Sequence, residues 1–385
     1  MPKNRFVSNI PFARKQSAAI SGRDTAMKKN KKNIMPSDGK KDNGIASKNK
    51  LIWSVLFIVI AAATIFTVIS TNKSFSISSF FGYIKQSNPF WLSLAFISSF
   101  GFIFFEGMAL RSASKAFSGI KRIGCFVSYS ASDIYFSAIT PSATGGQPAC
   151  AYLMIRDGLS GMSVTAILLA NLTMYTLALI VIGTAVLILF PGLFISFGLI
   201  PKILIISGFV IQCGLMMFFT ILLTRKNTLH KICSAVLHIP AKLHLIKNEA
   251  EKQEKLSRRM DEYGMCIEVL RGKRKMLLGV FIFNLLQRIS YVSTTVFAFL
   301  AAGGSYEHIG NLWALQCYAV LGSNSVPIPG AMGVSDYLML DGFKLIMNAQ
   351  SATNLELLSR GLSFYVCVIL CGVITVIKYL RQKKH

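Results

Sequence analysis

The sequence predicts an all-α polytopic membrane protein with about six full spans and two re-entrant or broken-helix hairpins. The 385 residues are 53% hydrophobic and only 15% charged, whereas about a quarter of the residues of a soluble domain are charged. Apolar runs close to the length of about 20 residues that crosses a bilayer recur along the chain. Two Pro/Gly-rich breaks, at 141–148 and 327–333, interrupt such apolar sequence.

Six apolar segments are predicted to span the membrane: 51–71, 90–110, 162–190, 201–224, 276–301 and 359–380. Two further segments, 123–160 and 311–350, each contain one of the breaks. We expect each of these two segments to fold as a hairpin. The count becomes eight transmembrane segments if the hairpins are counted as spans.

The distribution of basic residues predicts the orientation. Of the 41 Lys and Arg residues, thirteen lie in 1–50, four in 111–122, thirteen in 225–275 and four in 378–384. Cytoplasmic loops carry the excess of Lys and Arg, so we expect these regions, and with them both termini, to be cytoplasmic. Three full crossings between 123 and 224 would place 225–275 outside, which a hairpin in 123–160 avoids.

The same parity predicts that 311–350 starts and ends outside, with the limbs Asn311–Val326 and Val334–Met347. Two hairpins that enter from opposite faces are typical of an inverted-topology repeat.

Composition also predicts the domains and the partners. Residues 1–50 have no apolar core and are expected to be a disordered, basic cytoplasmic tail. Residues 51–382 are expected to form the transmembrane domain, with 225–275 as an amphipathic cytoplasmic loop on the inner membrane surface. The basic clusters lie between spans, which favours anionic lipid headgroups over nucleic acid as their partner.

No catalytic residues, metal site or cofactor are predicted. The eight cysteines are scattered without a CxxC pair, and the five histidines have no zinc-ligand spacing.

The two breaks are the predicted substrate site. Irregular backbone at membrane depth requires protein or a water-filled cavity around it, and paired breaks in two halves of a chain indicate a transporter's binding site. Each break can direct backbone N–H groups and a helix N-terminus at an anion. The alternative is that both breaks are kinks that let helices pack closely. The substrate-binding candidates in the breaks are Thr144, Gly145, Gly146, Gln147, Pro329, Gly330 and Gly333.

Ionisable residues in apolar stretches are the second group of candidates, because each is costly to bury without a partner. Arg288 lies in the middle of the span 276–301. We expect it to pair with an acidic residue (Asp133, Glu106 or Asp336) or to clamp a phosphate.

Three more residues complete the substrate-binding candidates: Arg156 after the first break, Asp336 after the second, and Arg360 at the opening of the last span. Candidates for charge pairing or proton coupling are Glu106, Arg111 and Asp133. The alternative for Arg111 and Arg360 is snorkelling to the interface. Asn171 and Gln287 are predicted to be interhelical hydrogen-bond partners.

Three motifs resemble those of a known family. They are Pro141–Pro148 followed by Ala151-Tyr152-Leu153, Pro327–Val334 followed by Asp336, and Leu357–Arg360. In this order they are similar to the signatures of the flippase-like transmembrane domain of bacterial lysylphosphatidylglycerol synthases (multiple peptide resistance factors). The likeness covers about 50–380. The chain has Ala331 and Asp336 where the family usually has Gly and Glu.

The resemblance implies a phospholipid translocase (flippase) that moves a phosphorylated or aminoacylated lipid between the leaflets of the bacterial inner membrane. The sequence has no GxxxxGK[ST] motif, so we expect a gradient or downhill flow to supply the energy.

Full-length synthases of this family add a soluble domain that transfers lysine from lysyl-tRNA to phosphatidylglycerol. Because the sequence ends at His385, directly after the last span, we expect no such activity from this chain. A separate lipid-modifying enzyme and an oligomer are candidate partners. Two alternative functions stay open: the membrane part of a lysylphosphatidylglycerol synthesis system (phosphatidylglycerol lysyltransferase family), and a small-solute transporter.

Overall fold

The computed structural model describes residues 77–117, 122–140, 143–224 and 272–383, together with 257, 260–261 and 263–270. All of these lie in one compact unit, Ile60–His385. The predicted tail 1–50, the predicted span 51–71 and most of the loop 225–275 lie outside the described residues.

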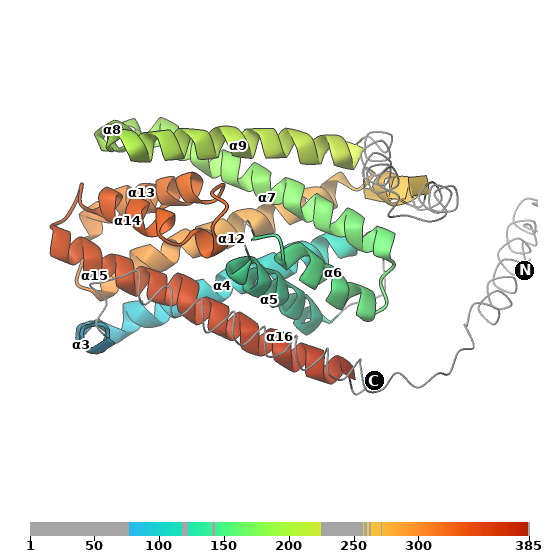
Figure 1. Ribbon diagram of the computed structural model, residues 1–385, viewed down its shortest axis with the longest axis horizontal. Coiled ribbons are helices and arrows are strands. Elements are labelled where there is room, and N and C mark those ends of the chain that lie inside the picture. Colours follow the sequence, from blue (N-terminus) through green and yellow to red (C-terminus); the bar gives the residue numbers. More distant parts are fainter. Residues whose placement is uncertain are drawn as a thin grey trace, which may run out of the picture. The chain divides into compact units, whose positions relative to one another are not determined.

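The regular elements of the described residues are all helical (Figure 1). They are α3 (Ile77–Gln86), α4 (Pro89–Ser114), α5 (Ile123–Ile139), α6 (Gly146–Arg156), α7 (Gly161–Leu189), α8 (Pro191–Ser196), α9 (Leu199–Thr224), α12 (Arg274–Ala301), η2 (Tyr306–His308), α13 (Ile309–Ser323), η3 (Pro329–Ala331), α14 (Val334–Phe343), α15 (Ala349–Arg360), the π-helical η4 (Gly361–Val366) and α16 (Cys367–Lys383).

Five helices of the described part are long and apolar enough to cross a membrane: α4, α7, α9, α12 and the continuous rod Ala349–Gln382 formed by α15, η4 and α16. The first four match the predicted spans to within a few residues. The all-α polytopic membrane class is therefore confirmed.

The last spanning rod begins earlier than predicted. It starts at Ala349, where the Asn348 side chain accepts a hydrogen bond from the backbone N–H of Ser351 (2.8 Å), and not at residue 359. Polar residues in 349–360 lower the hydropathy of this segment, so hydropathy did not predict that it belongs to the spanning helix. Its apolar side, with Leu355 and Leu358, is buried in protein. Arg360 consequently lies inside the rod and not at its opening, which corrects the prediction.

The helix α12 is the centre of the packing. It lies along α4 and also contacts α7, α13 and α15. Two buried polar contacts join it to its neighbours: Asn284 Nδ2 donates to Asn171 Oδ1 on α7 (3.0 Å), and Gln287 Nε2 donates to Glu106 Oε2 on α4 (2.9 Å). Asn171 and Gln287 are thus confirmed as interhelical hydrogen-bond partners.

Each break joins two short helices that pack against each other, α5 with α6 and α13 with α14. The two pairs lie toward opposite ends of the long helices (Figure 1). The second break reaches the first pair, because η3 contacts α5. The first break is shorter than predicted, since Gln147 and Pro148 already belong to the first turn of α6. That the pairs enter the bilayer from opposite faces stays a prediction.

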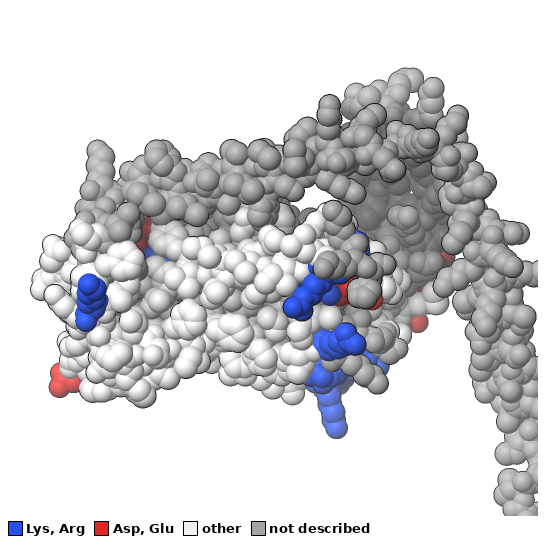
Figure 2. Space-filling model, turned by 90° about the horizontal axis from the view of Figure 1, so that it is seen from below, with Lys and Arg blue, Asp and Glu red and all other residues white. Residues whose placement is uncertain are grey.

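The outer surface suits a hydrocarbon environment. Large apolar side chains of α9 are exposed, among them Ile203, Val210 and Met217. Figure 2 shows an uncharged belt in the middle of one face, with most of the blue side chains of that face grouped near one end.

Gly208 on α9 allows a close approach to α13. A Cβ at this position would lie 2.0 Å from the backbone oxygen of Leu321, whereas one at Gly214 on the same helix would have no atom within 4 Å. We expect Gly208→Ala to destabilise the fold by about 1–3 kcal/mol, the usual cost of overpacking. Gly214→Ala is the matched control and should leave the midpoint unchanged or raise it. Thermal unfolding in detergent checks this, and equal midpoints for the two variants would contradict the packing.

Candidate functional site

Two buried acidic side chains meet beside the first break. The carboxyl groups of Glu106 on α4 and Asp133 on α5 lie beside each other and interact electrostatically. Gln287 Nε2 donates to Glu106 (2.9 Å), and Gln147 Nε2 from the first turn of α6 donates to Asp133 Oδ2 (2.6 Å). Ser137 Oγ adds a hydrogen bond to Asp133 Oδ1 (3.2 Å). Four helices thus converge on this acidic pair, Glu106 and Asp133.

Gly146 permits this convergence. A Cβ at Gly146 would lie 2.1 Å from Asp133 Oδ1 and 2.6 Å from the Asp133 backbone oxygen. The first turn of α6 therefore lies directly against the Asp133 carboxyl, where its positive end favours negative charge. The backbone N–H of Gly145 is also used internally, because it donates to Thr140 Oγ1 (2.9 Å). In this conformation the anion at the first break is a side chain of the protein itself.

Arg288 on α12 is held by aromatic rings. Its guanidinium carbon lies 4.4 Å from the ring centre of Tyr175, 5.3 Å from that of Phe102 and 5.9 Å from that of Tyr291. The residue is 8% exposed, and its Nε is buried without a hydrogen-bond partner. Among the described residues no carboxylate forms an ion pair with it. Of the two alternatives predicted for Arg288, direct pairing with an acidic residue is absent here.

Arg360 on α15, by contrast, has an ion pair. Its Nε lies 2.6 Å from Asp336 Oδ1, and its guanidinium carbon lies 4.6 Å from the ring centre of Phe364. The other oxygen of Asp336 accepts the backbone N–H of Gly333 (2.9 Å), at the start of α14. Arg360 Nη2 also reaches the backbone oxygen of Gly330 at 3.5 Å. The second break is therefore tied to the spanning rod through Asp336 and Arg360.

Glu356 completes this second cluster. It is 1% exposed, lies one turn before Arg360, and its carboxyl group interacts electrostatically with Asp336 and Arg360. Arg288 interacts electrostatically with Glu106, so Glu106, Asp133 and Arg288 form a first cluster of two acids and one arginine. Asp336, Glu356 and Arg360 form a second cluster of the same composition. Tyr291 lies close to both arginines, since its ring is one of the three around Arg288 and it interacts electrostatically with Arg360.

A π-helical turn, Gly361–Val366, follows Arg360 immediately. The backbone oxygen of Leu362 in this turn accepts a hydrogen bond from Ser99 Oγ on α4 (2.7 Å). Turns of this kind are rare and often occur at functional sites.

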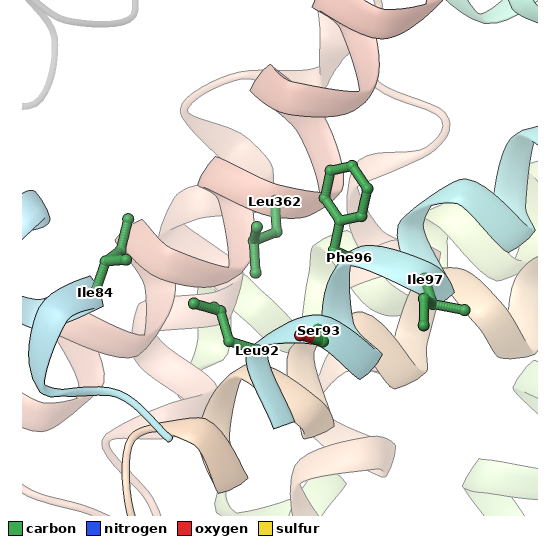
Figure 3. A pocket seen from close by; sticks show the side chains of 6 residues that line it. All are labelled: Ile84, Leu92, Ser93, Phe96, Ile97 and Leu362. Carbon is green, nitrogen blue, oxygen red and sulfur yellow. The ribbon is translucent and has the colours of Figure 1, made fainter. Parts of the chain in front are cut away.

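An open apolar groove of about 350 Å³ begins beside this turn. Figure 3 shows its lining, which comes from α3, α4 and the π-helical turn: Ile84, Leu92, Ser93, Phe96, Ile97 and Leu362. Leu362 lies two residues after Arg360, and helix side chains at this spacing do not face each other. The groove therefore opens on a different side of the spanning rod from Arg360.

The remaining predicted residues lie apart from these clusters. Arg156 is exposed and donates to Tyr152 Oη (3.2 Å) and to the backbone oxygen of Gln382 (3.1 Å).

Arg111 is half-buried and is not paired with Glu106, whose partners are Gln287 and Asp133. Thr144 is exposed at the first break. Tyr175 and Phe102 were not predicted from the sequence, whereas Glu356 is recognisable there by its spacing of four residues from Arg360.

Residues 51–371 match the family described as lysylphosphatidylglycerol synthase TM region. The chain belongs to this family. No curated protein matches it. As a lysylphosphatidylglycerol synthase TM region protein, it is a multi-pass membrane protein. The match includes both breaks, both acidic pairs and both buried arginines.

The backbone geometry at position 331 shows why glycine is expected there in the lysylphosphatidylglycerol synthase TM region family. Ala331 has φ 51°, in the left-handed region that favours glycine, and Ala143 in the first break has φ 53°. The glycine that the resemblance leads one to expect at position 331 would adopt this conformation without the steric cost of a Cβ.

A polar network joins the end of the first pair of helices to α16. Lys378 Nζ lies 2.6 Å from Asp157 Oδ2, Gln382 Nε2 donates to Asp157 Oδ1 (2.5 Å), and the Tyr129 hydroxyl donates to the same carboxylate. Partial burial alone would raise the pKa of Asp157, but the bonds from Lys378, Tyr129 and Gln382 outweigh it and leave the pKa below its ordinary value.

We expect Ala331→Gly to stabilise the protein by about 0.5–1 kcal/mol, because the relief of the left-handed alanine exceeds the added chain entropy. Ala302→Gly is the matched control, since Ala302 is exposed with φ −79° and gains no such relief. Thermal unfolding in detergent measures both. An equal loss of stability in the two variants would exclude strain at Ala331.

Lys378→Met should lower the thermal midpoint at pH 7, whereas Arg381→Met, on an exposed position of the same helix, should not. A depressed folded pKa means that the stability from Asp157 is present above its unfolded pKa of about 4 and is lost as the pH falls through the folded value. The difference between wild type and Asp157→Asn should therefore shrink below about pH 4. A difference that stays constant from pH 7 to pH 3 would contradict the network.

Proposed function

We propose that the protein is a phospholipid translocase that binds the headgroup phosphate at Arg288 and moves the lipid between leaflets. The observation behind this proposal is the state of Arg288. It is a cation inside the membrane-spanning bundle, with aromatic faces around it and no carboxylate in ion-pair contact among the described residues.

A phosphate is the anion that fits best. Cation–π contacts contribute about 0.5–2 kcal/mol each, which is less than the several kcal/mol needed to remove a charge from water. The guanidinium group presents a planar fork of donors that matches two phosphate oxygens. The rings of Tyr175, Phe102 and Tyr291 hold the group in place and leave its donors available to a ligand.

Arg360 supplies a second position for the phosphate. Tyr291 packs on Arg288 and interacts electrostatically with Arg360, and we infer that a headgroup leaving Arg288 is received at Arg360. In the present conformation Asp336 forms an ion pair with Arg360. A phosphate that displaces Asp336 would release the tie between the rod and the second break. Binding at Arg360 would thereby change the conformation of that break.

The acyl chains need an apolar path beside the headgroup. The groove around Leu92, Phe96 and Leu362 supplies apolar surface on the same spanning rod that carries Arg360. An open apolar groove on this rod favours a lipid over a small solute, because a small solute has no acyl chain to place there.

The finer parts of the proposal follow from the charge pattern and the family. We place the protein in the inner (plasma) membrane with both termini cytoplasmic, in contact with anionic phospholipids through its basic segments. The lipid is phosphorylated and can be aminoacylated, as the family name suggests. A separate lipid-modifying enzyme and an oligomer are proposed partners.

The test is leaflet exchange of fluorescent phospholipids in proteoliposomes. Arg288→Met should reduce exchange of phosphatidylglycerol about tenfold or more, since even one lost charge-assisted bond costs more than 1.4 kcal/mol. Arg288→Lys should recover part of the rate, because it keeps the charge but loses the fork. Lys85→Met, which removes an exposed charge at the end of α3, is the control and should exchange like wild type.

The outcomes separate the alternatives. Exchange that depends on the headgroup and is lost with Arg288 supports a translocase and names its substrate among phosphatidylglycerol, its lysyl form and phosphatidylethanolamine. No exchange by folded wild type, with and without a proton gradient, would overturn the proposal. Uptake of a soluble phosphate compound without lipid exchange would favour a small-solute transporter. Lysyl transfer from lysyl-tRNA would favour the synthesis alternative.

A further inference from the structure

The charges of the buried clusters do not balance. The first cluster contains Glu106, Asp133 and Arg288, and the second contains Asp336, Glu356 and Arg360; all six side chains are buried or nearly so. With every group ionised, each cluster has one negative charge in excess. An uncompensated charge in the membrane interior is costly. Each cluster therefore needs one additional positive charge.

Contact between the carboxyl groups identifies that charge as a proton. Glu106 and Asp133 are buried beside each other. Two ionised carboxylates at such a site repel each other strongly, and one proton on the pair removes that repulsion. One shared proton makes the cluster of Glu106, Asp133 and Arg288 electrically neutral.

Unused polar atoms at the acidic pair indicate that it receives a further ligand. Gln287 is 1% exposed and donates to Glu106, yet its Oε1 has no hydrogen-bond partner. Arg288 Nε is likewise buried without one. Both an acceptor and a donor are thus available beside the shared proton.

The charged and titratable groups around the pair come from several helices. Arg288 is on α12 and Tyr175 is on α7, while Cys150 on α6 and Cys367 and Cys371 on α16 complete the set with electrostatic contact to the acidic pair. Arg288 is the only fixed cation among these neighbours. Any anion that binds Arg288 therefore changes the charge balance of the carboxyl pair directly.

We propose that the protein takes up one proton with each anionic headgroup, and that the acidic pair of Glu106 and Asp133 holds this proton. This inference rests on the proposed function. A phosphate with one negative charge at Arg288 leaves the cluster one charge short of neutrality. A proton from water on the side that admits the headgroup restores the balance by adding to the ionised member of the pair. Release of the lipid on the other side returns the proton to water there.

The proton also acts on the first break. Asp133 is the carboxyl group against the first turn of α6, and it holds Gln147 at that turn. When Asp133 is neutral, its attraction to the positive end of α6 weakens. Loading with phosphate and proton therefore loosens the contact between α5 and α6, which couples occupancy to movement of the break.

The experiment measures proton uptake when dihexanoyl-phosphatidylglycerol binds to the full chain in detergent, by calorimetry in buffers of different ionisation enthalpy. We expect about one proton per headgroup and, by linkage, affinity that falls about tenfold for each pH unit of increase in the range where the proton is taken up. Dihexanoyl-phosphatidylethanolamine brings its own positive charge and should bind without proton uptake.

Variants make the assignment specific. The double variant Glu106→Gln, Asp133→Asn has no acidic pair, so Arg288 alone neutralises the phosphate. We expect this variant to bind the lipid without proton uptake and independently of pH. The matched control is Glu307→Gln with Asp341→Asn, two acids outside the clusters, and it should keep the uptake of one proton.

The results distinguish this inference from the function on which it rests. Lipid exchange by wild type with no proton uptake on binding would overturn the coupling and leave the translocase intact. Absence of both binding and exchange would overturn the translocase itself. Equal proton uptake with both lipids, or unchanged uptake in the double variant, would show that the acidic pair does not hold the coupled proton. The wild-type measurements decide the matter even if the double variant does not fold.

Discussion

Charges inside a hydrocarbon layer are costly to bury, and the need to compensate them determines how the helices of this protein meet. The charged side chains come from α4, α5, α12, α14 and α15, and all of them except Arg288 meet a polar or oppositely charged group of another helix. Asp336 and Arg360 fix the second break against the spanning rod, while Glu106, Gln287 and Asp133 fix α5 against α4 and α12. The apolar core then fills the space between these fixed points. A change at one charged residue therefore acts on several helices at once.

The sequence allows two interpretations of the breaks, as kinks for close helix packing or as sites where backbone dipoles meet an anion, and the geometry fits both. Gly146 is small because α6 approaches the backbone of α5, which is the role of a packing kink. The same approach delivers the positive end of α6 to Asp133. At Gly330 an added Cβ would meet the ring of Phe364, 2.3 Å away, and the backbone oxygen there faces Arg360. Close packing is thus the means by which backbone dipoles reach the ionisable groups, so a structural and a functional role coincide in the same glycines.

Hydropathy and charge parity predict most of the fold, because span length and the location of basic residues are properties of single segments. Arg288 can be selected from its mid-span position alone. Its aromatic surroundings cannot, since Tyr175 and Phe102 reach it only through the rotation of α7 and α4 about their axes. The contact of Glu356 with Asp336 likewise depends on the path of the second break. The start of the last rod was missed because only one side of residues 349–358, with Leu355 and Leu358, is apolar, and that side is buried by protein. Mean hydropathy over the segment does not detect such one-sided burial.

The π-helical turn after Arg360 has a geometric consequence of its own. A π-helical turn holds one residue more than an α-helical turn, and one residue corresponds to about 100° of rotation about the helix axis. If Gly361–Val366 relaxes to α geometry, Arg360 swings around the axis relative to α16 while the rod stays continuous. The hydroxyl of Ser99 donates a hydrogen bond to the backbone oxygen of Leu362 and thereby stabilises the π-helical form of the turn. The rod can therefore act as a rotary joint, turning its arginine from one neighbour to another without tilting or sliding in the membrane.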